Sequence, residues 1–180
     1  MERFDVLLAG LGGGGVLLAG ELLARAAIPQ YEYVTWYPYY GAQQRGGPSQ
    51  CFVILSDEAI ASPYVSRPKA VIALEQSQFK PFEQWVASGG LMVTESLELT
   101  DETEREDIKL LKCAGLEIAM KLGDRRASNF CLLGAYVGMT HCVSPGSVKR
   151  EIEKKFVDQK ASSLNMDAFN KGLELASNSD

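Results

Sequence analysis

The chain has 180 residues, of which 46% are hydrophobic and 23% are charged, a balance that is typical of one globular domain. The net charge of −5 argues against nucleic acid as a partner, because binding to phosphates favours a basic surface. No hydrophobic run approaches the roughly 20 residues of a membrane-spanning helix, and the start at Glu2 and Arg3 is unlike a signal peptide. We therefore expect one cytoplasmic domain over residues 1–180, with no nucleic acid and no membrane as a partner.

The first predicted strand covers residues 4–9, and its unbroken apolar run is typical of a parallel strand covered on both faces. A glycine-rich turn follows, in which Gly10, Gly12 and Gly15 match the spacing G-x-G-x-x-G, and a helix then runs to about Pro29. Such glycines either present backbone N–H groups to a ligand or partner, or let the helix pack closely on the strand. The residues that we expect to contact an anion or a partner's carbonyl are Gly12, Gly13, Gly14 and Gly15.

A second, short strand is predicted over residues 33–36, which are β-branched and aromatic. A dinucleotide-binding fold of the Rossmann type has an acidic residue after this strand, and that residue holds the ribose hydroxyls. This chain has Tyr37, Pro38, Tyr39 and Tyr40 there, so we do not expect it to bind NAD.

Residues 39–50 are predicted to form a loop, in which Arg45 stands directly before Gly46, Gly47 and Pro48. The Arg45 guanidinium can bind a carboxylate or a phosphate through two parallel hydrogen bonds. The alternative is an arginine that is solvated or that forms an internal salt bridge. A strong apolar strand over residues 51–56 follows the loop.

The rest of the chain alternates strands with helices before it becomes helical. Strands are predicted over residues 70–74, 91–95 and 108–111, and a helix over residues 78–88 that stops at Gly89 and Gly90. The acidic run over residues 100–107 is interpreted as a solvated connection. Four further helices are predicted over residues 116–122, 128–140, 147–156 and 166–176.

This order of elements predicts an α/β fold, namely a three-layer α/β/α domain with a mostly parallel, Rossmann-like sheet and a helical C-terminal third. The residues expected in its core are Val6, Leu8, Val53, Ile54, Val71, Ile72 and Val93.

The thiols and the single histidine do not form a recognisable site. The four cysteines contain no C-x-x-C pair, so we predict neither a zinc site nor an iron–sulfur cluster on this chain. His141 and Cys142 are adjacent, and adjacent residues on a helix do not face each other, so we predict no catalytic pair. We interpret Cys131 and Cys142 as buried packing groups, and we expect no catalytic residue and no metal ligand on this chain.

Three separated segments carry a resemblance to a known family. The glycine turn reads AGLGGGGV where the family usually has G-x-G-G-Q-G-V, and residues 40–63 read YGAQQRGGPSQCFVILSDEAIASP. In the carboxyl half, residues 116–138 follow the pattern E-I-A-x-x-L-G-x-x-x-x-x-N-x-x-x-L-G-A, and residues 165–176 follow N-x-x-A-F-x-x-G. On these residues the chain resembles the gamma subunit, or gamma domain, of the 2-oxoacid:ferredoxin oxidoreductases, which include pyruvate, 2-oxoglutarate, ketoisovalerate and indolepyruvate enzymes. Gly14 stands where the family commonly has glutamine, so contacts at that position must come from backbone atoms.

The resemblance implies a subunit of a hetero-oligomeric oxidoreductase. Enzymes of this family decarboxylate a 2-oxoacid with thiamine diphosphate, pass electrons through iron–sulfur clusters to ferredoxin, and transfer the acyl group to coenzyme A. This chain has no G-D-G…N motif, so thiamine diphosphate, magnesium and [4Fe-4S] clusters are expected on alpha and beta partner subunits, with an optional ferredoxin-like delta subunit. The isolated chain is then expected to be inactive.

The resemblance also implies that a partner or ligand contacts the R-G-G loop, whose R-G-G-P sequence looks most like the 2-oxoglutarate or general ketoacid branch. The residues concerned are Tyr40, Gly41, Arg45, Gly46 and Gly47. A free-standing nucleotide-binding or regulatory α/β module remains the alternative.

Overall fold

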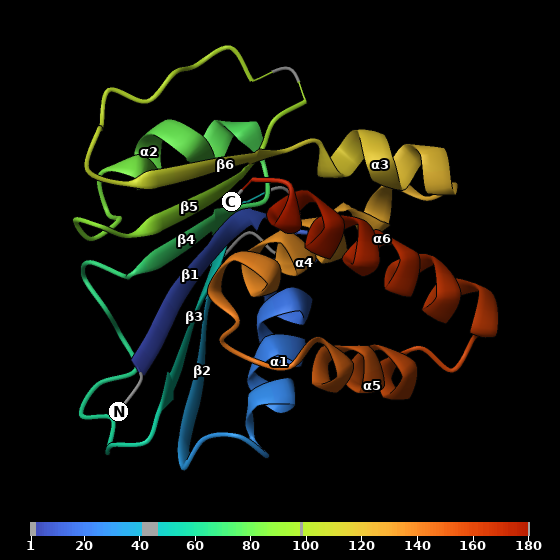
Figure 1. The fold of residues 1–180 in the computed structure, drawn as a ribbon, viewed down its shortest axis with the longest axis horizontal. Coiled ribbons are helices and arrows are strands. Elements are labelled where there is room, and N and C mark those ends of the chain that lie inside the picture. The colour runs from blue at the N-terminus through green and yellow to red at the C-terminus, as the bar shows by residue number, and fades with distance from the viewer. Residues whose placement is uncertain (1–2, 41–46, 98, 180) are drawn as a thin grey trace.

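A computed structural model describes residues 3–40, 47–97 and 99–179 of the chain. Within these residues, six strands form one sheet in the order β2-β3-β1-β4-β5-β6 (Figure 1). The strands are β1 (Arg3–Leu11), β2 (Tyr33–Tyr40), β3 (Pro48–Ser56), β4 (Ala70–Ala73), β5 (Leu91–Glu95) and β6 (Lys109–Cys113).

The sheet is mostly parallel, which confirms the predicted fold class. The pairs β1–β4, β4–β5 and β5–β6 are parallel, whereas β3 runs antiparallel to both β1 and β2. Antiparallel neighbours can be joined by a short connection, whereas parallel neighbours need a crossover. The short connection from β2 to β3 therefore explains why β3 is the reversed strand.

Helices cover both faces of the sheet, unequally (Figure 1). One face carries α1 (Val16–Ala27), α3 (Gly115–Leu122), α4 (Ser128–Thr140), α5 (Pro145–Lys155) and α6 (Gln159–Ser177), whereas the other carries the short α2 (Phe79–Glu83). Alternate residues of β1 face these two layers: Val6 and Leu8 pack under α1, and Leu7 and Ala9 pack towards α2. The three-layer prediction is confirmed, and all seven predicted core residues are buried.

Several predicted boundaries were too short. The first strand extends to Leu11, so Gly10 lies within β1 and pairs with Ser49 rather than belonging to the turn. The second strand runs on to Tyr40 through Pro38, which is tolerated because β2 is an edge strand. Similarly, α6 begins at Gln159 because Asp158 caps it, accepting a hydrogen bond from the Ala161 amide at 2.8 Å.

The predicted helix over residues 78–88 was wrong in length, since α2 ends at Glu83. Residues distant in sequence form hydrogen bonds with the backbone amides and carbonyls that a longer helix would pair internally. The Ala87 amide donates to the Pro68 carbonyl at 2.9 Å, and one Arg105 nitrogen, Nη1, donates to the carbonyls of Glu83 and Val86 at 3.0 and 2.7 Å. These competing bonds close the end of α2 and tie the acidic connection to it.

Arg105 is therefore expected to stabilise the fold, although it lies in the segment predicted to be merely solvated. Its side chain is 15% exposed, and besides the two carbonyls it binds Asp107 through two nitrogens, at 2.8 and 2.6 Å. Arg105→Ala should lower the free energy of unfolding by about 2 kcal/mol, because charged hydrogen bonds to buried carbonyls are lost. Urea unfolding at neutral pH measures this loss.

Arg126→Ala is the matched control, because Arg126 binds Asp124 in the same way but is 84% exposed; we expect a smaller loss than for Arg105→Ala. The pH dependence of the free energy of unfolding provides a second test of the role of Arg105. Hydrogen bonding to Arg105 lowers the pKa of Asp107 to about 2, so the pair's contribution is present above about pH 4 and is lost as pH falls towards 2. The free energy of unfolding of Arg105→Ala should therefore lack the part of its pH dependence that this pair supplies in the wild type. A pH dependence in this acid range equal to that of the wild type would contradict the assignment.

Candidate functional site

The glycine turn, defined as Gly12, Gly13, Gly14 and Gly15, connects the carboxyl end of β1 to the start of α1. The parallel strands β4 and β5 end at the same edge of the sheet. Glu75 follows the end of β4, after Leu74, and Glu95 is the last residue of β5. From β1 the chain crosses through α1 to the β2–β3 side, whereas β4 to β6 lie on the other side. In open α/β sheets, ligands bind in the crevice at such a switch point.

Internal contacts hold the glycine turn in its shape. Gly13 and Gly15 have φ angles of 98° and 78°, which side chains other than glycine rarely adopt. The Gly14 amide donates to the Leu11 carbonyl at 3.0 Å, and the Gly12 amide donates to the Gly47 carbonyl at 2.8 Å. Two of the four amides predicted to contact an anion or partner are thus used internally, and an external acceptor could use only those of Gly13 and Gly15.

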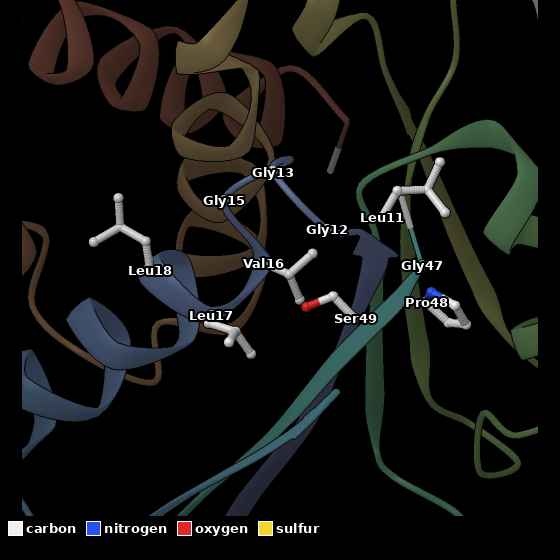
Figure 2. A pocket seen from close by; sticks show the side chains of 10 residues that line it. All are labelled: Leu11, Gly12, Gly13, Gly15, Val16, Leu17, Leu18, Gly47, Pro48 and Ser49. Atoms are coloured by element: carbon white, nitrogen blue, oxygen red, sulfur yellow. The ribbon is translucent and has the colours of Figure 1, made fainter. Parts of the chain in front are cut away.

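The bond from Gly12 to Gly47 also places the end of the R-G-G loop against the glycine turn. A cavity of about 450 Å³ opens between them, with Leu17 and Leu18 of α1 on one side and Pro48 of β3 on the other (Figure 2). Thus the structure brings together Gly12, Gly13, Gly15 and Gly47 of the predicted contact set. Gly41, Arg45 and Gly46 lie outside the described residues, as does the side chain of Tyr40.

Gly14 lines a second cavity, of about 400 Å³, at the ends of β4 and β5. A Cβ atom at this position would lie 3.1 Å from the Leu11 carbonyl oxygen and 3.5 Å from Oε1 of Glu75. A side chain here would therefore extend beside Glu75, and the glycine leaves that carboxylate accessible from the cavity. Arg125 and Arg126 line the same cavity.

Glu95 also lines this cavity, but its two oxygens are occupied by backbone amides. Oε1 accepts from Ser96 and Leu97 at 3.0 and 2.9 Å, and Oε2 accepts from Leu116 at 2.8 Å. Because Ala114 at the start of α3 cannot cap the helix with its side chain, Glu95 supplies the acceptor from β5. Burial raises the pKa of Glu95, against the lowering effect of these bonds, so its main role is structural.

Sequence reasoning missed Glu75, Arg125, Arg126 and Asn129. A usable signal existed for Glu75, which directly follows the predicted strand over residues 70–74, at the edge where parallel strands end. Asn129 was part of the quoted family pattern without a role. In the structure its Nδ2 donates to the Gly15 carbonyl at 3.2 Å and its Oδ1 accepts from the Phe130 amide at 2.9 Å, so α4 holds the start of α1.

Gly15 and Gly13 form a matched pair for testing this contact. Both have positive φ, so alanine at either should cost about 1–2 kcal/mol in backbone strain. Only at Gly15 would the new Cβ also overlap the Asn129 side chain, since nothing lies within 4 Å of that atom at Gly13. Chemical denaturation should therefore show a larger loss for Gly15→Ala than for Gly13→Ala; equal losses would mean that Asn129 moves aside without penalty.

No metal centre is found among the described residues, where no group of three or more His, Cys, Asp or Glu side chains could hold an ion. All four cysteines are buried and free, which includes Cys131 and Cys142, for which burial was predicted, and burial raises the pKa of Cys51 to about 12. Within the described ranges, no helix is both long and apolar enough to cross a membrane.

Comparison with known proteins identifies relatives along nearly the whole chain. Residues 5–175 match the family Pyruvate ferredoxin/flavodoxin oxidoreductase. The 2-oxoglutarate synthase subunit KorC of Methanocaldococcus jannaschii is 32% identical over 177 residues, which cover 97% of this chain and 94% of that protein. The ketoisovalerate oxidoreductase subunit VorA of Methanothermobacter thermautotrophicus is 39% identical over 134 residues, 74% of this chain, but the match spans only 28% of that longer relative.

Solved structures agree with this result. The gamma subunit of a keto/oxoacid ferredoxin oxidoreductase from Geobacter sulfurreducens superposes with a TM-score of 0.83 at 26% identity, covering 97% of this chain and 99% of that one. The pyruvate oxidoreductase subunit PORC of Thermotoga maritima gives a TM-score of 0.79 at 26% identity, covering 97% of each chain. The chain therefore belongs to the pyruvate ferredoxin/flavodoxin oxidoreductase family.

Proposed function

We propose that this chain is the gamma subunit of a hetero-oligomeric 2-oxoacid:ferredoxin oxidoreductase, in which residues 1–180 form one gamma-type domain. The observation that carries the proposal is the end-to-end match to the 2-oxoglutarate synthase subunit KorC, which covers 97% of this chain and 94% of that subunit. The same relative supports 2-oxoglutarate, to which the R-G-G-P loop also pointed, as the first substrate to test. We place the complex in the cytoplasm.

The proposal assigns the redox chemistry to partner subunits. Thiamine diphosphate with magnesium and the [4Fe-4S] clusters would lie on the alpha and beta subunits and on a ferredoxin-like delta subunit where one is present. Coenzyme A would be the co-substrate and ferredoxin the electron acceptor. The arrangement of the side chains supports this division, because among the described residues no three His, Cys, Asp or Glu side chains are grouped so that they could hold a metal ion, whereas a cluster needs four ligands.

The contact surface of this subunit would be the carboxyl edge of the sheet. The hydrogen bond from Gly12 to Gly47 joins the two segments predicted to contact partners or ligands, and cavities open on both sides of the glycine turn. The proposal keeps Tyr40, Gly41, Arg45 and Gly46 among the residues that contact a partner or ligand.

Purification tests the proposal directly. The tagged chain, isolated from its source organism, should co-purify with alpha and beta subunits, and the complex should contain iron and thiamine diphosphate. It should reduce ferredoxin in the presence of 2-oxoglutarate and coenzyme A, whereas the isolated chain should be inactive. Micromolar binding of thiamine diphosphate to the isolated chain, measured by calorimetry, would contradict the proposed division of labour.

The alternative is a free-standing nucleotide-binding or regulatory module, which the crevice at the switch point favours. In that case the native chain would purify alone. NAD is an unsuitable ligand for either function, because β2 ends at Tyr39 and Tyr40 without an acidic residue for the ribose. Equilibrium dialysis that gave tight, stoichiometric NAD or NADP binding would overturn this exclusion.

A further inference from the structure

The two edge strands of the sheet differ in how they are protected. β2 runs over eight residues at one margin of the sheet, and β6 runs over five residues at the other (Figure 1). β6 carries Lys109 and Lys112, both exposed, and lysines on an edge strand discourage another chain from pairing with it. Residues 33–40 contain no lysine or arginine, so β2 lacks this protection. A long, aromatic edge strand without such charges is one that native proteins normally cover.

Pro38 determines which backbone groups of β2 remain open. A proline has no N–H for the ladder, so in an edge strand its nitrogen faces away from the neighbouring strand. Successive residues of a strand direct their backbone groups to alternate sides, so Val34 and Trp36 also direct their N–H and carbonyl groups away from β3. Pro38 itself closes only one position. Donors and acceptors over residues 34–36 therefore remain available to a further strand.

Tyrosine side chains cover one face of β2 and continue onto the neighbouring strand. Tyr33, Tyr37 and Tyr39 alternate along β2 and share a face, and they are 39%, 40% and 60% exposed. Tyr37 stands opposite Phe52 of β3, and Tyr64, which is 50% exposed, packs edge to face on Phe52 with ring centroids 5.1 Å apart. We call these four tyrosines the tyrosine face. They expose about 400 Å² of side-chain surface, roughly half of what one partner buries in a stable interface.

The charges beside the tyrosine face indicate the chemistry of the chain that covers it. Glu32 stands directly before β2, and Asp57 and Glu58 stand directly after β3, so these exposed carboxylates lie at the same end of the antiparallel pair. None of the three forms an ion pair within the part of the chain that the structure describes, and Arg3 at this end is already paired with Asp5 at 3.5 Å. A cationic partner is favoured, because arginine both pairs with carboxylates and stacks on tyrosine rings.

We propose that the free edge of β2 and the tyrosine face dock a partner subunit, which adds an extended segment to β2 as a further strand and places arginine or lysine side chains against Glu32, Asp57 and Glu58. Such strand addition takes its affinity from main-chain hydrogen bonds and its specificity from side chains. A second copy of this chain fits less well, because it has a net charge of −5 and no lysine or arginine in β2. The inference rests on the proposed function, since it requires the hetero-oligomeric complex.

Hydrogen exchange tests where the partner binds. In the isolated chain, ¹H–¹⁵N spectra should show fast exchange for the amides of Val34 and Trp36 and slow exchange for those of Thr35 and Tyr37, which face β3. In the purified complex, mass spectrometry should show that peptides covering residues 33–40 become protected. A complex that contains alpha and beta subunits but leaves these peptides unprotected would overturn the inference and leave the proposed function standing.

A lysine on the tyrosine face should give β2 the protection that β6 has. Tyr37→Lys should weaken the affinity for the partner subunit at least about tenfold, because an interface tyrosine is lost and the new cation meets the cations of the partner. Tyr39→Lys should act in the same way, and at 60% exposure this residue tolerates the change if Tyr37→Lys does not fold. Lys112→Ala, on the opposite edge, is the control and should assemble as the wild type does.

Three results would contradict the inference. Unchanged affinity of folded Tyr37→Lys and Tyr39→Lys would show that the tyrosine face is not the docking surface. A dimer of the isolated chain in sedimentation, lost in Tyr37→Lys, would identify a second copy as the occupant. A native chain that purifies without any partner would refute the proposed function and this inference together.

Discussion

Replacing Gly172 with alanine should lower the free energy of unfolding by about 3 kcal/mol, although the same change in an open helix normally stabilises. Gly172 of α6 faces α4, and a Cβ atom there would overlap the Cys131 carbonyl oxygen and stand 2.6 Å from the Ala135 amide nitrogen. Both are backbone atoms, so no side chain can rotate away and the two helices must separate. Urea unfolding, followed by circular dichroism, measures the loss.

The contact is reciprocal, because a Cβ at Gly134 of α4 would overlap the Phe169 carbonyl of α6. Gly134→Ala should therefore be destabilising as well, and the double variant should lose less than the sum, since one separation of the helices relieves both overlaps. Gly146→Ala in α5 is the control, because no atom lies within 4 Å of its Cβ position. If Gly172→Ala were as stable as Gly146→Ala, the close crossing of α4 and α6 would be disproved.

Replacing Arg45 with alanine should weaken subunit assembly, or raise the apparent Michaelis constant for coenzyme A, by an amount that corresponds to roughly 2–5 kcal/mol. That range applies when one member of a buried charge pair is truncated, and it follows from the proposal that Arg45 meets a partner's acidic group or the anionic coenzyme A. The position of Gly47 against Gly12 supports the prediction, because the R-G-G loop ends beside the glycine turn. Subunit affinity and coenzyme A kinetics of the reconstituted complex are the measurements.

If Arg45 is instead solvated, Arg45→Ala should change subunit affinity, or the apparent Michaelis constant for coenzyme A, by an amount that corresponds to no more than about 0.5 kcal/mol. Arg67→Ala is a suitable control, since Arg67 is exposed and makes no hydrogen bond or ion pair within the described residues. Arg150 is less suitable, because it donates to the Ser147 hydroxyl at 2.9 Å in α5. Equal, negligible effects of Arg45→Ala and Arg67→Ala would mean that the loop matters through its backbone and not through its charge.

Local patterns predicted the fold class because they depend on neighbouring residues. The apolar runs of β1, β3, β4 and β5 marked the buried strands, and glycines marked the turn before α1. Boundaries were less predictable where distant groups compete for the backbone. The end of α2 depends on Arg105 and Pro68, which lie far from it in sequence, and no periodicity within residues 78–88 reports them.

Some features of the candidate site could likewise be predicted from local sequence, whereas others depend on contacts between distant residues. The sequence by itself determined that a glycine turn starts the first helix and that an R-G-G loop precedes an apolar strand. The backbone freedom of glycine and the charge of arginine belong to the residues themselves and do not depend on tertiary contacts. Only the tertiary structure decided that Gly47 accepts from Gly12 and that Asn129 holds Gly15. The second contact joins residues 114 positions apart. Both contacts form only when segments distant in sequence pack together, so no local pattern reports them.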